Sequence, residues 1–263
     1  MADEEVLQDS AQRRILRVGD TVRRPLHPWS ATIHELLRHL AAVGFPYSPR
    51  VLGIDEDGRE VLSFIAGDSG PDGWDRAVDE AGLVAMARLL REYHEAVQGF
   101  QPSSDAAWAA RRGAPGDGEL VCHGDFGPWN LVWRGTQPVG ILDWDYAWPH
   151  PKVHDIAYAL EYVAPFRDDD ECVRWLRYPG PPDRRRRLEL FAEAYGLTSV
   201  DGLVDEVIAQ QELVVARARQ LAAEGRQPQL AWQADGTLDA GAQRIGWSRR
   251  HRHLFAPGSG EGR

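Results

Sequence analysis

Eight consecutive residues dominated by turn formers, from Ala66 to Gly73, divide this sequence into two parts with different patterns. Before them, short β-branched runs bounded by turn residues predict strands. After them, apolar residues recur at helical spacing over long stretches. We therefore expect an α+β protein with a small antiparallel sheet lobe over residues 1–65, a hinge or linker at 66–73 and a larger, mostly helical lobe over 74–256. Residues 257–263 are expected to form a flexible tail.

The part before the linker predicts four strands and one helix. We expect the strands at residues 14–18, 21–24, 50–54 and 60–64. Between the second and third strands, apolar residues recur every three or four positions from Ile33 to Val43. Ser30 is expected to cap this helix and Gly44 to end it. Beyond the linker, helices are predicted around residues 78–93, 155–162, 183–195, 199–223 and 237–252.

The composition excludes several kinds of partner. The chain has 40 acidic and 30 basic residues, a formal net charge of −10. Nucleic-acid binding needs a concentrated basic face, so we expect no nucleic-acid partner. The acidic N-terminus does not resemble a signal peptide, and no apolar run approaches the roughly 20 residues that span a bilayer. Only Cys122 and Cys172 are present, too few for a disulfide framework. We expect a cytoplasmic protein, a monomer or homodimer, that does not bind membranes.

Three oxygen-bearing side chains in one short stretch carry the chemistry. Asn130 follows Asp125 by five residues, and Asp143 follows Asn130 by 13. The apolar runs 130–133 and 138–142 predict a hairpin between the last two. Phosphoryl transfer needs a carboxylate that orients the attacking hydroxyl and oxygen ligands that hold Mg²⁺ on the phosphates. This spacing supplies both.

The stretch also resembles a known family. His123-Gly124-Asp125 with Asn130 five residues on, followed by Ile141-Leu142-Asp143-Trp144-Asp145, resembles the aminoglycoside phosphotransferase and choline kinase-like family, relatives of the protein kinases. The resemblance is strongest from Leu120 to Leu160 and implies a bilobal protein kinase-like fold. It also implies transfer of phosphate from ATP or GTP, with Mg²⁺, to a small molecule such as an aminoglycoside or another amino sugar or amino alcohol.

The resemblance assigns roles to individual residues. Asp125 is then the catalytic base or the group that orients the hydroxyl, and His123 supports this catalytic loop. Asn130 and Asp143 are the magnesium ligands. Asp155 corresponds to the family's structural aspartate after the metal site.

The sequence departs from the kinase pattern at the residue that grips phosphate. Kinases use a lysine on the third strand, paired with a glutamate on the following helix. The only lysine here is Lys152. Arg23 falls at the expected position and Arg24 is the second choice; only one can face the cleft, because successive strand residues point to opposite sides. Glu35 is the only acid near the place of the helix glutamate.

Further nucleotide contacts are expected at two places. Gln8 to Gln12 stands where a glycine-rich phosphate loop is expected, and this segment has no glycine. Backbone groups of Ser63, Phe64 and Ile65, at the end of the last strand before the linker, are expected to hold the base.

The acceptor site is expected between the catalytic loop and the C-terminal helices. Its candidate residues are Asp145, Trp129, Trp148 and Asp168. The acidic run from Asp168 to Glu171 also fits a solvated helix start, and Arg184 to Arg187 fits one solvated face.

Two other functions remain open. Without the lysine, the chain could be a catalytically weak or inactive pseudokinase that binds a nucleotide or metabolite. A metal-dependent hydrolase that uses His123, Asp125 and His154 is a third hypothesis.

Overall fold

The computed structural model describes residues 4–9 and 13–256. By internal contacts the chain forms two compact units, one of residues 1–73 and 89–155, the other of residues 74–88 and 156–263. The first unit thus combines the predicted sheet lobe with the predicted catalytic loop. The lobe boundaries given above stay predictions, and the expected tail lies outside the described residues. In the described part of the chain, no helix has the length and apolar character needed to cross a membrane.

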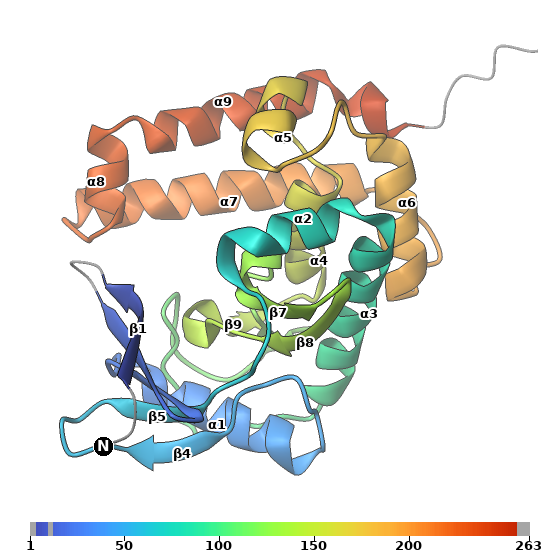
Figure 1. Cartoon of the computed structure of the whole chain (residues 1–263). Coiled ribbons are helices and arrows are strands. Elements are labelled where there is room, and N and C mark those ends of the chain that lie inside the picture. The colour runs from blue at the N-terminus through green and yellow to red at the C-terminus, as the bar shows by residue number, and fades with distance from the viewer. Residues whose placement is uncertain (1–3, 10–12, 257–263) are drawn as a thin grey trace, which may run out of the picture. The chain divides into compact units, whose positions relative to one another are not determined.

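An antiparallel sheet of five strands forms the N-terminal part of the first unit (Figure 1). Four of its strands match the predicted ones, and β1 was not predicted, because all six of its residues are exposed and show no alternation. In spatial order the strands are β1 (Glu4–Asp9), β2 (Arg14–Val18), β3 (Thr21–Arg24), β5 (Glu60–Ser63) and β4 (Val51–Ile54).

Helix α1 (Ser30–Ala42) follows β3 and buries its predicted apolar face. Leu36 and Leu40 are fully buried, and Gly44 ends the helix with a left-handed φ of 81°. The predicted cap is wrong in detail. Ser30 is the first helical residue, and its hydroxyl accepts a hydrogen bond from the backbone N–H of His27 at 2.9 Å.

The stretch from residue 120 to 150 adds short elements to the first unit. The predicted hairpin is confirmed as β7 and β8, and β9 pairs with β6 although the sequence did not predict it. The elements are β6 (Leu120–Cys122), η2 (Pro128–Asn130), β7 (Leu131–Arg134), β8 (Gln137–Ile141), η3 (Trp144–Tyr146) and β9 (Trp148–His150).

The predicted linker packs closely against this hairpin. Asp68 and Trp133 exchange two backbone hydrogen bonds, of 2.9 and 2.7 Å. A Cβ atom at Gly73 would lie 2.0 Å from the carbonyl oxygen of Pro128. Because two non-hydrogen-bonded heavy atoms need more than 3 Å, only glycine fits there. The linker is therefore fixed against β7 at Asp68 and against η2 at Gly73.

The second unit is helical. Helices α7 and α9 pack side by side and are joined through α8 (Figure 1). Helices α3 and α4 each begin in one unit and end in the other. The helices of the chain after the linker are α2 (Gly73–Val78), α3 (Glu80–Ala96), α4 (Val153–Val163), α5 (Asp169–Trp175), α6 (Arg184–Tyr195), α7 (Leu203–Ala223), α8 (Gln229–Ala234), α9 (Thr237–Arg250) and η4 (Arg252–Phe255), with η1 (Gly70–Asp72) in the linker itself.

The prediction of one solvated arginine face at the start of α6 is wrong for two of the four arginines. Arg184 and Arg187 are buried. Arg184 donates to the carbonyl of Pro165 at 2.8 Å, and Arg187 donates to the carbonyl of Ala77 at 2.6 Å. These guanidinium groups satisfy backbone carbonyls inside the second unit, a use that local sequence patterns do not reveal.

The close approach at Gly73 gives a test of the fixed linker. Gly73→Ala should destabilise the protein by about 2 kcal/mol, because the added methyl group must push the linker away from Pro128 on η2. Gly180→Ala is the control, since a Cβ atom there meets no atom within 4 Å. Urea unfolding measures both; equal stability of the two variants would show that the linker is not fixed there.

Candidate active site

The catalytic loop begins with a sharp turn at Gly124. This residue has a left-handed φ of 78°, and a Cβ atom on it would lie 2.2 Å from the carbonyl oxygen of Tyr146. The turn brings two backbone segments into direct contact, so any side chain at this position would separate them. Three residues later, the N–H of Gly127 donates to the carbonyl of Asp125 at 2.8 Å. The loop therefore has a tightly determined path.

A buried carboxylate fixes the base of this loop. Asp155 is fully buried, and its two oxygens accept hydrogen bonds from the backbone N–H groups of His123 (2.7 Å) and Gly124 (2.8 Å) and from Nε2 of His94 (3.1 Å). Burial alone would raise the pKa of Asp155, but the hydrogen bond from His94 and the neighbouring imidazoles lower it to about 2. Asp155 thus holds the first two residues of the loop through their backbone N–H groups.

His123 links the loop to the strand before Asp143. Its Nε2 contacts the carbonyl oxygen of Leu142 at 2.9 Å, and its Nδ1 accepts from the backbone N–H of Asp125 at 3.3 Å. A neutral imidazole with the proton on Nε2 satisfies both contacts. Both ring nitrogens are thus occupied within the loop, which fits a supporting role.

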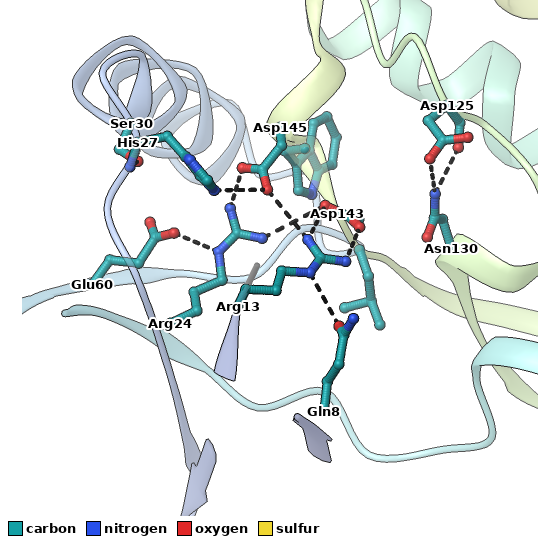
Figure 2. A network of polar contacts seen from close by, with 12 residues as sticks. Gln8, Arg13, Arg24, His27, Ser30, Glu60, Asp125, Asn130, Asp143 and Asp145 are labelled. Atoms are coloured by element: carbon teal, nitrogen blue, oxygen red, sulfur yellow. Dashed lines mark hydrogen bonds and ion pairs between the residues drawn. The ribbon is translucent and has the colours of Figure 1, made fainter. Parts of the chain in front are cut away.

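Asp125 and Asn130 face each other across the loop (Figure 2). The side-chain amide of Asn130 donates to the Asp125 carboxylate at 2.8 Å and to its carbonyl at 2.9 Å. The backbone N–H of Leu142, the residue before Asp143, donates to the carbonyl of Asn130 at 2.7 Å. A hydrogen-bonded framework therefore links Asp125 and Asn130 to the backbone next to Asp143, whose own carboxylate contacts Arg13.

Asp143 has unusual backbone geometry. Its φ of 57° and ψ of 63° lie in the left-handed region, which few residues other than glycine adopt. Such strain is common at functional sites. Burial would raise the pKa of its carboxyl group, but the hydrogen bonds and charge of Arg13, helped by Arg24, lower it. Asp143 is therefore held as a carboxylate.

Arg24, at the end of β3, is the buried cation of the site. Its guanidinium contacts Glu60 and Asp145 closely and lies 3.7 Å from Asp143 (Figure 2). The contact with Glu60 follows from the sheet, because the two residues are direct partners in the β3–β5 ladder. Burial opposes the charge of Arg24, but the surrounding carboxylates outweigh it and raise its pKa.

The acidic partner of Arg24 is Glu60 on β5, whereas we expected a glutamate on the helix that follows β3. Its other oxygen lies 2.6 Å from Nε2 of His34 on α1, so a histidine connects the helix to the pair. Glu35 lies elsewhere and accepts two hydrogen bonds from Ser103. Arg23 points away from Arg24, and its guanidinium lies 3.8 Å from Asp55. Of the two arginines considered, the structure places Arg24 among the site carboxylates.

In the segment Ser63 to Ile65, which was expected to bind the nucleotide base, two backbone N–H groups already donate hydrogen bonds within the protein. The N–H of Ser63 donates to the carbonyl of Arg50 at 2.9 Å, and the N–H of Phe64 donates to Asp20 at the same distance. Ile65 packs over Gly140, where a Cβ atom would lie 2.8 Å from its side chain. A base bound here would have to use carbonyl groups or the amides that follow Phe64.

The acceptor candidates have separate surroundings. Asp145 is buried in the arginine network, with its carboxylate close to Arg24 and 3.7 Å from His27. Trp129 lies on η2 and is half-buried, and Trp148 packs edge to face on His154 at 5.5 Å. Asp168 belongs to the second unit, where its carboxylate accepts from the N–H of Glu171 at 2.8 Å and caps α5.

Sequence reasoning missed one exposed side chain beside the catalytic loop. Tyr146 follows Asp145 and is 47% exposed. Partial burial and the carboxylates of Asp125, Asp143 and Asp145 raise its pKa, so its hydroxyl stays protonated near them. The resemblance covers this position, but no motif marks it.

The donor set fits a magnesium ion. Mg²⁺ takes carboxylate and amide oxygens together with water molecules. Asp143 supplies a carboxylate, and Asn130, whose NH₂ group is turned to Asp125, has its amide oxygen to offer. Soft ligands are not part of this set. In the described part of the chain, one group of three His, Cys, Asp or Glu side chains has its ligand atoms close enough together to hold a single metal ion. Its members are His94, Cys122 and Asp155. Burial raises the pKa of the Cys122 thiol well above its usual value, which disfavours metal binding.

That result weakens the hydrolase hypothesis. His123, Asp125 and His154 do not form a ligand group of this kind in the described part of the chain.

Known proteins resemble this chain in sequence. Residues 101–191 match the model of the phosphotransferase enzyme family. The trifolitoxin immunity protein of Rhizobium leguminosarum bv. trifolii is 36% identical over 215 residues, which cover 79% of this chain and 80% of that protein. The chain belongs to the phosphotransferase enzyme family.

Solved structures agree on the fold. A choline/ethanolamine kinase family protein from Mesorhizobium loti has a TM-score of 0.62 at 17% identity, with 96% of this chain and 92% of that chain covered. The GDP complex of aminoglycoside 2'-phosphotransferase-IIIa has a TM-score of 0.57 at 14% identity, with 95% and 93% covered. The predicted kinase-like fold, with an N-terminal antiparallel sheet and helix and a mostly helical C-terminal part, is confirmed.

The buried Asp155 carboxylate predicts a pH-dependent loss of stability. Asp155→Asn should destabilise the protein by about 3 kcal/mol at pH 7, since a charged acceptor of three hydrogen bonds is lost. The pKa of Asp155 is about 2 when folded, against about 3.9 when unfolded, so its charge stabilises the fold above pH 4 and loses this effect as the pH falls toward 2. Urea unfolding should show the gap between wild type and variant narrowing by about 1 kcal/mol from pH 7 to pH 3. Asp117→Asn, at an exposed position, is the control, and a gap that does not change with pH would contradict the assignment.

Replacement of the two neighbouring arginines, Arg24 and Arg23, should lower the stability of the protein by very different amounts. Arg24→Met leaves the buried carboxylates of Glu60 and Asp145 without their cation, which should cost about 3–5 kcal/mol. Arg23→Met removes only a 3.8 Å pair with Asp55, which Arg59 also contacts, and should change stability by less than about 1 kcal/mol. Chemical unfolding of both variants at neutral pH makes the comparison. Equal losses would mean that Arg24 has no special place in the site.

Proposed function

We propose that this protein transfers the γ-phosphate of ATP or GTP to a hydroxyl group of a small molecule, with Mg²⁺ as cofactor. The observation that carries the proposal is the framework of Asp125, Asn130 and Asp143, held in place by Asp155 and His123. Family membership supports it, and the phosphotransferase with GDP bound shares the fold.

The chain's own residues divide the work of phosphoryl transfer. The carboxylate of Asp125 accepts the hydrogen bond of the acceptor hydroxyl and orients its oxygen toward the phosphate. Asn130 donates to the same carboxylate and so fixes its direction. When Mg²⁺ is bound, by Asp143 and Asn130, it offsets the negative charge of the phosphate oxygens. Burial raises the pKa of Asp145, and the charge of Arg24 opposes this rise while its guanidinium holds Asp145 in place and helps to lower the pKa of Asp143.

The names of related proteins suggest which chemical class of acceptor to test. Structural neighbours include a choline/ethanolamine kinase family protein and an aminoglycoside phosphotransferase. The net charge of −10 suits acceptors that carry amino groups. The relative at 36% identity is named for immunity to trifolitoxin, so we propose to include that toxin among the acceptors tested.

Loss of the orienting carboxylate should separate catalysis from binding. Asp125→Ala should lower the rate of phosphate transfer by about a thousandfold and change nucleotide affinity little. A radiolabelled γ-phosphate screen over aminoglycosides, macrolides, amino alcohols, sugars and trifolitoxin first identifies an acceptor. The variant and the control Asp117→Ala are then compared on it. Undiminished turnover in Asp125→Ala would reject the role of this residue.

An inactive, nucleotide-binding protein is the second candidate, and one observation favours it. Arginine replaces the phosphate-binding lysine, and its guanidinium is already engaged by Glu60 and Asp145. Calorimetry with Mg²⁺ and ADP, together with an assay of slow ATP hydrolysis, distinguishes the two. Nucleotide binding without transfer to any acceptor and without hydrolysis would favour the inactive protein.

A further inference from the structure

A second arginine reaches the site from the first hairpin. Arg13 directly precedes β2, and its Nη2 and Nη1 atoms lie 2.9 and 3.3 Å from the two oxygens of Asp143. Nη1 is also 3.5 Å from Asp145, and Nε donates to the side chain of Gln8 on β1 at 3.1 Å. The side chain is about one quarter exposed, at 28%. In Figure 2 it lies beside Arg24, and both point at the same two aspartates.

This contact uses the atoms that a metal ion would need. The guanidinium of Arg13 contacts both carboxylate oxygens of Asp143. A divalent cation on the same carboxylate would lie within a few ångströms of the guanidinium, and two positive charges at that distance repel each other strongly. Arg13 and the metal therefore compete for Asp143.

The charges explain why an arginine is present before any ligand binds. Asp143, Asp145 and Glu60 lie together around Arg24. One arginine cannot offset three carboxylates in a partly buried site. Arg13 supplies the second positive charge, and its hydrogen bonds to Asp143 are the largest influence that lowers the pKa of that group.

A bound nucleotide would offer Arg13 a new partner. A guanidinium pairs with phosphate oxygens in the same two-pronged geometry that it uses with a carboxylate. The sequence from Gln8 to Gln12 contains no glycine, and its residues 10–12 lie outside the described part of the chain. The same hairpin provides Arg13 instead, from a position next to the carboxylate that the metal requires.

We propose that Arg13 is a phosphate-binding residue that occupies Asp143 in the nucleotide-free protein and exchanges this carboxylate for the nucleotide phosphates when metal and nucleotide bind. This inference rests on the proposed function, since it assumes a nucleotide at the site. It adds a residue that neither the kinase motifs nor the family resemblance marks.

The test uses two binding measurements whose changes should have opposite signs. In Arg13→Gln, affinity for Mn²⁺ alone should rise about tenfold, because Asp143 loses its competing cation, and affinity for ADP in the presence of Mg²⁺ should fall about tenfold, because a charge-assisted contact to phosphate is lost. Isothermal titration calorimetry measures both on the full chain, and electron paramagnetic resonance confirms the Mn²⁺ result. Arg14→Gln is the matched control; Arg14 is the next residue, is 57% exposed and lies 3.9 Å from Asp9. It should leave both affinities unchanged.

Each other outcome contradicts a defined part of the inference. If both affinities fall, Arg13 only maintains the structure of the site. If Mn²⁺ affinity rises but ADP affinity stays the same, Arg13 competes with metal but does not bind phosphate. If neither changes, its contact with Asp143 has no role in binding. If the wild-type protein binds no ADP or GDP with Mg²⁺, the proposed function itself fails, whereas the Mn²⁺ measurement still reports whether Arg13 competes for Asp143.

Discussion

Compensation of charge around Arg24 is the constraint on which the candidate site depends. Three carboxylates, on β5 and on the segment after β8, lie against one buried guanidinium. Removing charged groups from water is costly unless each finds a partner of opposite sign. The pair of Arg24 and Glu60 is set by the register of the sheet, and its extension to Asp145 joins the sheet to the segment that carries Asp143. The position of Asp143, the proposed metal ligand, thus depends on strand pairing 80 or more residues earlier in the chain.

Asp155 plays a comparable part for the catalytic loop. It satisfies two consecutive backbone N–H groups that would otherwise be buried without acceptors. His123 then connects the loop to the strand before Asp143. The candidate catalytic loop is therefore oriented by buried groups behind it, which is the usual way in which a site keeps its geometry.

The sequence predicted the parts of this structure that depend on local pattern. The apolar period from Ile33 to Val43 gave α1, and the spacing of Asp125, Asn130 and Asp143 indicated the loop and hairpin. Non-local partners could not be predicted. Glu60 reaches Arg24 only because β5 pairs with β3, and the buried Arg187 finds its carbonyl acceptors 109 and 110 residues away. Strand β1 escaped prediction because a wholly exposed edge strand has no hydrophobic period.

The location of the Arg24–Glu60 pair determines whether movement of a helix can break it. In protein kinases the matching ion pair joins a strand to a helix, and movement of that helix makes or breaks it. Here both partners belong to adjacent strands, which backbone hydrogen bonds hold in fixed alignment. Helix α1 contacts the pair through His34. An outward movement of α1 would leave the cation and its carboxylate together, so this ion pair does not depend on a helix position as the pair in protein kinases does.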